Sequence, residues 1–294
     1  MVNTKPKARV REAISAGIFY PDDPEQLTRM LENTIAKACY AEFAKYERPL
    51  AILAPHAAFS FALGTQAAGW KTLLNYKNAN PDWSTERFVI ISVKHGFSGR
   101  QVYLPELDYF DTPLGKLRVD KKACRELESS STVFTRSYLS HLENNGIELQ
   151  LPFMRLLFPN AMLVPLLVSG GPQTASALAR SLDLCFAGSM DKTMFVISAN
   201  LASSMDADDA EQRSAEMLKL LTKGQWRDVA ARGDIAGSLA MAALLAMNAM
   251  AESRYQFICR KSSSAANLNK PGFYNERIVH YASSVWFGRK THES

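Results

Sequence analysis

The chain contains the run Leu50-Ala51-Ile52-Leu53-Ala54-Pro55-His56, in which five apolar residues lead to a proline and a histidine. A second run, F-V-I-I-S-V at residues 88–93, is followed by a lysine and His95, and a third, F-V-I-S at residues 195–198, leads to Asn200. Continuous apolar runs rich in β-branched residues are typical of strands that are buried on both faces. The sequence therefore predicts a central sheet, with polar residues following three of its strands.

Segments with helical spacing of apolar residues separate these runs. Apolar residues recur at intervals of three and four in each of them, which is typical of one buried helix face. The predicted helices are residues 24–38, 63–74, 147–157, 174–186, 207–221 and 238–251. Further strands are predicted at residues 162–168, 255–259 and 278–282, and Pro165 indicates an edge or a bulge in the first of these.

The alternation of strands and helices predicts an α/β fold. We expect one three-layer domain over residues 1–294, with a mostly parallel or mixed central sheet. Neither an internal repeat nor a long linker interrupts the pattern. Residues 1–12 are polar and basic, and we expect them to form a flexible tail.

Composition narrows the range of partners and compartments. Hydrophobic residues make up 47% of the 294 residues and charged residues 21%, as is typical of globular proteins. The net charge of +5 comes without a basic stripe, so we expect no nucleic-acid partner. No apolar run reaches the roughly 20 residues of a membrane helix, and no secretion signal is visible. We expect a cytoplasmic protein without a membrane partner, whose four widely spaced cysteines stay reduced.

The residues after the strands are the candidate functional site. In open α/β sheets, ligands bind beyond the carboxyl ends of the strands. His56, His95 and Asn200 each follow a predicted strand, so we expect the two histidines at neighbouring strands, converging on one cleft. Imidazoles in such positions suit a metal site or acid–base chemistry. A structural histidine, hydrogen-bonded within the fold, is the alternative for each.

The order of short motifs along the chain resembles the Memo family. A-G-I-F-Y-P at residues 16–21 resembles the family's A-G-S-W-Y-P, and A-I-L-A-P-H-A at residues 51–57 resembles its A-I-I-A-P-H-A. T-P-L-G at residues 112–115 matches a family motif, and I-E-L-Q-L-P-F at residues 147–153 resembles L-E-V-Q-L-P-F. The resemblance covers nearly the whole chain. It implies the three-layer architecture that this family shares with class III extradiol ring-cleaving dioxygenases.

The resemblance also implies a metal site, which is altered in this chain. Members of the Memo family place metal-binding residues at two histidines and a cysteine. His56 and His95 stand at the two histidine positions, and Ala236 stands at the cysteine position. A thiolate is a strong anionic ligand, whereas the methyl group of alanine offers none. Two neutral imidazoles alone would hold iron, copper or zinc weakly, so we expect a weak or absent metal site.

At other polar positions of the family, too, this chain lacks a metal-binding or charged side chain. Asn145 stands at a family histidine, Asn200 at a family aspartate and Ser203 at a further histidine, whereas Glu148 is kept. Amides form hydrogen bonds but do not act as general bases near neutral pH. Lys94 adds a cation beside His95, and its ammonium either faces the cleft, where it would favour an anion, or reaches solvent.

Two functional hypotheses follow. The first is a diverged, dioxygenase-like, metal-dependent oxidoreductase that acts on a small molecule. The residues expected to serve in catalysis are His56, His95, Asn145, Glu148 and Asn200. If a metal is bound, Glu148, His141 or Cys259 could supply a missing ligand. The alternative is a non-catalytic protein that binds a metabolite or partner in the same cleft.

Overall fold

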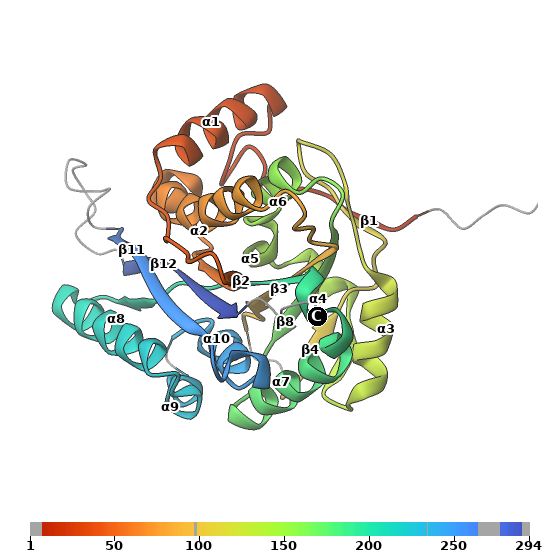
Figure 1. Ribbon diagram of the computed structural model, residues 1–294, viewed down its shortest axis with the longest axis vertical. Helices are drawn as coiled ribbons and strands as arrows, with labels where there is room; N and C mark the ends of the chain where they lie inside the picture. The colour runs from red at the N-terminus through yellow and green to blue at the C-terminus, as the bar shows by residue number, and fades with distance from the viewer. Residues whose placement is uncertain (1–7, 97–98, 234, 264–276, 290–294) are drawn as a thin grey trace, which may run out of the picture.

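In the computed structural model, which describes residues 8–96, 99–233, 235–263 and 277–289, a mixed sheet of nine strands forms the centre of the protein (Figure 1). The strands follow the order β10-β12-β2-β9-β3-β8-β4-β7, and β11 pairs with β12. Their bounds are β2 (Glu47–Ala54), β3 (Arg87–Val93), β4 (Val102–Leu104), β7 (Phe134–Arg136), β8 (Met162–Val168), β9 (Thr193–Ser198), β10 (Ala202–Ser204), β11 (Arg254–Ser262) and β12 (Ile278–Arg289). The predicted α/β fold with a mixed sheet is confirmed.

The parallel strands β2, β9, β3 and β8 form the middle of this sheet. Every residue of β9 is buried, as the run of apolar side chains in its sequence predicts. Pro165 lies on β8 opposite Ile90 of β3. On the other side, β4 pairs with β8 only at Leu167 and Val168, so Pro165 lies where the strand is locally an edge.

Helices cover both faces of the sheet (Figure 1). One face carries α1 (Pro24–Lys37), α2 (Phe59–Ala79), α5 (Asn145–Glu148) and α6 (Leu151–Leu157), and the other carries α7 (Pro172–Phe186), α8 (Ala207–Thr222), α9 (Trp226–Ala231) and α10 (Ser238–Leu245). Two more helices, α3 (Lys121–Ser130) and α4 (Tyr138–Leu142), lie near the β4 end, and 3₁₀ turns span Ala187–Lys192 and Asn248–Met250. Asp23, Asp120 and Asp206 accept main-chain N–H groups and so begin α1, α3 and α8. Within the described residues, no helix combines the length and apolarity that a membrane crossing requires.

A small second sheet includes residues 10–11, so the prediction of a flexible tail at residues 1–12 is wrong for this part of it. Its strands are β1 (Val10–Arg11), β5 (Tyr109–Phe110) and β6 (Leu117–Arg118), and β1 pairs in parallel with β5. Arg11 is buried, with 1% of its surface exposed. The sequence favours a solvated Arg11, because its buried partner Glu148 lies 137 positions away along the chain. Residues 1–7 lie outside the described part of the chain.

Candidate functional site

The candidate site lies at the carboxyl ends of β2, β9 and β3, from which His56, Asn200 and His95 follow in turn. The ring centroids of His56 and His95 are 5.8 Å apart, and the two planes meet at 77°. The structure thus brings the two imidazoles together. The expectation that they follow neighbouring strands was wrong, because β9 pairs with both β2 and β3 and lies between them. This insertion is what brings Asn200 to the same place.

His56 is a buried residue whose tautomer follows from its surroundings. Its Nδ1 lies 2.8 Å from the main-chain oxygen of Ser198, which can only accept a hydrogen bond. Nδ1 therefore carries the proton, and Nε2 keeps a lone pair. Burial lowers the pKa of His56 to about 4, and the nearby His95 adds to this effect. His56 is therefore neutral at physiological pH.

His95 is exposed and lies beside a lysine that is not. Partial shielding of its ring from water, and then the positive charge of Lys94, lower the pKa of His95 below its usual value. The Lys94 side chain is only 17% exposed, and its Nζ lies 3.6 Å from an oxygen of Glu143, which is itself 66% exposed. Lys94 therefore keeps its charge close to the imidazoles and does not reach freely into solvent.

Asn200 positions the backbone of His56. Its Oδ1 accepts the main-chain N–H of His56 at 3.1 Å. This use of the oxygen leaves the amide NH₂ group as a donor. An aspartate at this position could accept the same hydrogen bond, but it would bring a negative charge where Asn200 brings a neutral donor.

The turn that begins α5 packs directly against His56. A methyl group at Gly146 would overlap the Oγ of Ser92 and lie 3.3 Å from Nδ1 of His56, so the position requires glycine. Asn145, the first residue of α5, is half-buried beside it. The side chain of Asn144 accepts the N–H of Gly146 and donates to the main-chain oxygen of Val93. These bonds fix the turn against the end of β3.

A buried polar network below His56 was missed by the sequence analysis. Ser92 donates to the main-chain oxygen of Ser198 at 3.0 Å, and Ser198 donates to that of Gly146 at 2.6 Å. Gln150 donates to Ser198 and to the main chain of Pro55, and accepts the indole N–H of Trp70. The signal was present in the sequence, since serines near the ends of two apolar strands need hydrogen-bond partners.

Glu148, which we predicted to be catalytic, binds the N-terminal segment between Arg11 and Tyr20. Its carboxylate accepts Nη1 of Arg11 at 2.7 Å, the hydroxyl of Tyr20 at 2.7 Å and the N–H of Ser15 at 2.8 Å. Both side chains of the Arg11–Glu148 ion pair are at most 1% exposed. Burial, followed by the charge of Glu148, raises the pKa of Tyr20. These contacts satisfy the carboxylate, and within the described residues they do not include either histidine.

The other three candidates are His141, Cys259 and Ser203. Each has its own surroundings, which do not favour a role as a metal ligand. His141 is buried, points Nε2 at the main-chain oxygen of Tyr103, and has a pKa that burial lowers to about 3. Burial, with a smaller effect from Cys39, raises the pKa of Cys259 to about 11, so this residue is a thiol at neutral pH. Ser203 lies on β10, where it pairs with Val279 of β12.

Ala236 is exposed and is followed by Gly237, which has a positive φ of 95°. A side chain at Gly237 would overlap Ala199, so glycine lets α10 begin against the end of β9. Ala236 offers no ligand there. Within the described part of the chain, no group of three or more His, Cys, Asp or Glu residues is arranged to hold a metal. The donors at the site, two imidazoles and an amide beside an ammonium, do not fit tight binding of iron, copper or zinc.

Comparison with known families gives the same architecture. The sequence profile of the Memo-like protein family matches residues 11–270. The chain belongs to this family. A MEMO1 family protein of Methanobrevibacter smithii is 30% identical over 210 residues, which cover 68% of this chain and 71% of that protein. One of Pyrococcus furiosus is 33% identical over 148 residues, covering 50% of this chain and 48% of the relative.

A solved structure supports the Memo-like fold. It is the crystal structure of an uncharacterized protein from Escherichia coli K12, which matches with a TM-score of 0.53. The match covers 80% of this chain and 98% of the other at 12% sequence identity. At this identity the similarity concerns the fold.

Proposed function

We propose that this Memo-family protein binds a small organic anion at the carboxyl ends of β2, β9 and β3, and holds no tightly bound catalytic metal there. The observation that carries the proposal is the charge of the site. Lys94 is mostly buried, and its charge lowers the pKa of His95, while both imidazoles are neutral. Glu143 lies 3.6 Å from the ammonium but is largely exposed, so it offsets only part of this charge, and the arrangement disfavours a divalent cation and favours an anion.

The hydrogen-bonding groups suggest what the ligand carries. The amide NH₂ of Asn200 and the ammonium of Lys94 are donors, which suit a carboxylate. Nε2 of His56 is an acceptor, because Nδ1 carries the ring proton. A molecule with one carboxylate and one hydroxyl group would satisfy both kinds of group. Salicylate is a simple probe with that chemistry, benzoate lacks its hydroxyl, and phenol lacks its carboxylate.

Calorimetric titration with these three compounds tests the proposal. We expect salicylate to bind more tightly than benzoate or phenol. Asn200→Asp should weaken salicylate binding by about tenfold, because a like charge within reach of a bound carboxylate costs on the order of 1.4 kcal/mol. Asn78→Asp is the matched control, since Asn78 is exposed near the far end of α2. Equal affinity for salicylate and phenol, or no effect of Asn200→Asp, would contradict the proposal.

A diverged metal-dependent oxidoreductase is the second candidate, and one observation favours it. The anchored Nδ1 and free Nε2 of His56 match the way in which ligating histidines are commonly held by a main-chain carbonyl. Elemental analysis of protein purified without added metal distinguishes the candidates. Stoichiometric iron, copper or zinc would support the oxidoreductase, and a content well below one ion per chain would support the anion-binding protein.

A further inference from the structure

A polar cavity lies at the end of the sheet opposite the histidine pair. It has a volume of about 930 Å³ and is lined by Arg87 at the start of β3 and Met162 at the start of β8. The two strands are parallel and these residues are paired, so the cavity lies at the amino ends, away from His56 and His95. Small-molecule sites commonly occupy roughly 300–1,000 Å³. The cavity is therefore large enough for a metabolite, and it is separate from the histidine site.

Cations outnumber acidic residues around this cavity. The acidic lining residues are Glu106, Asp108 and Asp120. The basic ones are Arg9, Arg87, Arg118, Lys121, Lys122 and Arg136. A concave surface with an excess of one charge concentrates its field and raises the local concentration of oppositely charged molecules. Glu126 and Glu128, just outside the lining, offset part of this excess by pairing with Lys122 and Arg136, so the attraction for an anionic ligand centres on Arg118, for which no carboxylate partner is present in the described part of the chain.

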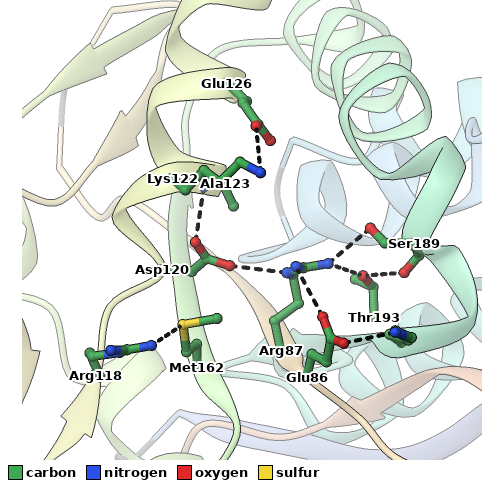
Figure 2. Close-up of polar contacts among 11 residues, drawn as sticks. Glu86, Arg87, Arg118, Asp120, Lys122, Ala123, Glu126, Met162, Ser189 and Thr193 are labelled. Carbon is green, nitrogen blue, oxygen red and sulfur yellow. Dashed lines mark hydrogen bonds and ion pairs between the residues drawn. The ribbon is translucent and has the colours of Figure 1, made fainter.

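Some of these cations are fixed in the cavity wall. The Arg87 guanidinium donates to Asp120 at 3.0 Å, to Ser189 at 2.9 Å and to Thr193 at 3.2 Å, as Figure 2 shows. Asp120 also accepts the main-chain N–H of Ala123, so it is fully engaged. Lys121 is paired with Asp108 and Arg136 with Glu128 in the same manner. These groups shape the wall and are already neutralised.

Other cations are held weakly. Figure 2 shows the Arg118 side chain turned toward the sulfur of Met162, to which its Nη2 donates at 3.0 Å. A thioether is a weak acceptor, and in the described part of the chain Arg118 forms no ion pair with a carboxylate. The Nζ of Lys122 lies 3.9 Å from Glu126, and its side chain is 82% exposed. Both cations can turn toward a ligand without breaking a strong contact.

The start of α3 adds a further reason for an anion. Lys121 and Lys122 occupy the first two positions of this ten-residue helix, and its first turn carries no acidic residue. The amino end of a helix is the positive end of its dipole and repels both lysines, and the carboxylate of Asp120, which caps α3, offsets only part of this repulsion. A bound anion would relieve this repulsion while accepting hydrogen bonds from the lysine ammonium groups.

We propose that the cavity at the amino ends of β3 and β8 binds a phosphorylated small molecule with at least two negative charges, and that Arg118 and Lys122 are its principal contacts. The guanidinium of Arg118 can bind two phosphate oxygens at once, whereas the ammonium of Lys122 acts as a point charge that follows the ligand. The fixed pairs around Arg87 form the floor against which the ligand lies.

The test is calorimetric titration of the full chain with inorganic pyrophosphate at low and at moderate ionic strength. We expect one pyrophosphate per chain and a loss of about tenfold or more in affinity for Arg118→Gln combined with Lys122→Gln. The matched control is Lys45→Gln combined with Lys223→Gln, which removes the same charge from exposed positions outside the cavity. This control should bind pyrophosphate as the wild type does. Thermal unfolding of each variant confirms that it is folded.

Three results would overturn the proposal. One is the absence of pyrophosphate binding by the wild type at millimolar concentration and low salt. Another is an equal loss of affinity in the control variant, which would show a general effect of net charge. The third is binding of a short RNA or DNA duplex far more tightly than pyrophosphate, with the same dependence on Arg118 and Lys122. That outcome would assign the surface to a polynucleotide.

Discussion

The two ends of the central sheet present opposite chemistry. At the carboxyl ends, His56 and His95 are neutral imidazoles set over a buried hydrogen-bond network, with one cation beside them. At the amino ends, six arginines and lysines line an open cavity, and two of them, Arg118 and Lys122, are only weakly held. Neutral groups held rigidly select a ligand by shape and hydrogen bonding, whereas mobile cations select it by charge. We therefore propose a different kind of ligand for each end of the sheet.

Removing the buried arginine that supports the histidine site should have the largest effect on stability. Arg11 donates to Glu148 and to the main-chain oxygens of His141 and Asn144, which hold the turn beside His56. Arg11→Ala leaves Glu148 buried without its counter-ion, so we expect a loss of about 3–5 kcal/mol in the free energy of unfolding. Chemical denaturation measures this.

The control for that loss is a neighbouring surface residue. Arg9→Ala removes an exposed arginine whose guanidinium lies 3.7 Å from Glu106, and it should cost no more than about 1 kcal/mol. Similar losses of unfolding free energy in both variants would show that Arg11 does not anchor the turn beside His56.

Acid should destabilise the protein through two buried histidines, His56 and His141. His56, with a pKa of about 4, and His141, with a pKa of about 3, bind protons less readily in the folded protein than in the unfolded chain. The unfolded state therefore holds more protons as pH falls below about 6.5, and stability is lost down to the folded pKa values. The expected loss from His56 alone is on the order of 3 kcal/mol.

Denaturation between pH 4 and 7 measures this effect. His56→Gln should flatten the pH dependence relative to the wild type, because glutamine does not titrate in this range. An unchanged slope in His56→Gln would contradict the assignment of His56 as a neutral, buried group.

A smaller effect is expected when the turn beside His56 is filled. Gly146→Ala places a methyl group against Ser92 and His56, so we expect a loss of about 1–3 kcal/mol and a displaced imidazole. Gly188→Ala is the control, because a methyl group there meets no atom within 4 Å. Thermal unfolding and the NMR signals of the His56 side chain report the two consequences. A tolerated Gly146→Ala would show that the turn is loosely packed.

The smallest expected effect is a partial repair of the metal site. Ala236→Cys places a thiol where the resemblance to the Memo family implies a cysteine, and a thiolate supplies both a ligand and a negative charge. We expect zinc affinity to rise by about tenfold, which corresponds to about 1.4 kcal/mol. The gain should vanish when His56→Ala is added. Equal zinc affinity in the wild type and both variants would show that Ala236 does not face the histidines.

Much of the fold could be predicted because its signals are local. The apolar runs of β2, β3 and β9 identify buried strands, and the edge character of Pro165 follows from its missing N–H. The single helix predicted at residues 147–157 is two helices, α5 and α6. Pro152 lies in the first turn of α6, where its ring would clash with the carbonyl four residues earlier in a continuous helix.

The site could be predicted only in part because its remaining signals are not local. His56, His95 and Asn200 follow strands and were found by that rule. The partnership of Arg11 with Glu148 spans the sequence, and nothing near either residue indicates it. The residues that line the cavity at the amino ends come from separate stretches of the chain, and no sequence motif connects them. Short strands such as β1 and β10, of two and three residues, carry too little pattern to be seen.

We propose that the histidine site of this Memo-family protein favours an organic anion over a metal ion. The most direct test is a competition titration of the wild type with zinc and with ferrous iron against a chelator of known affinity. We expect dissociation constants of 1 µM or weaker, which correspond to binding free energies no more favourable than about −8 kcal/mol. Nanomolar binding of either metal that disappears in His56→Ala would contradict it.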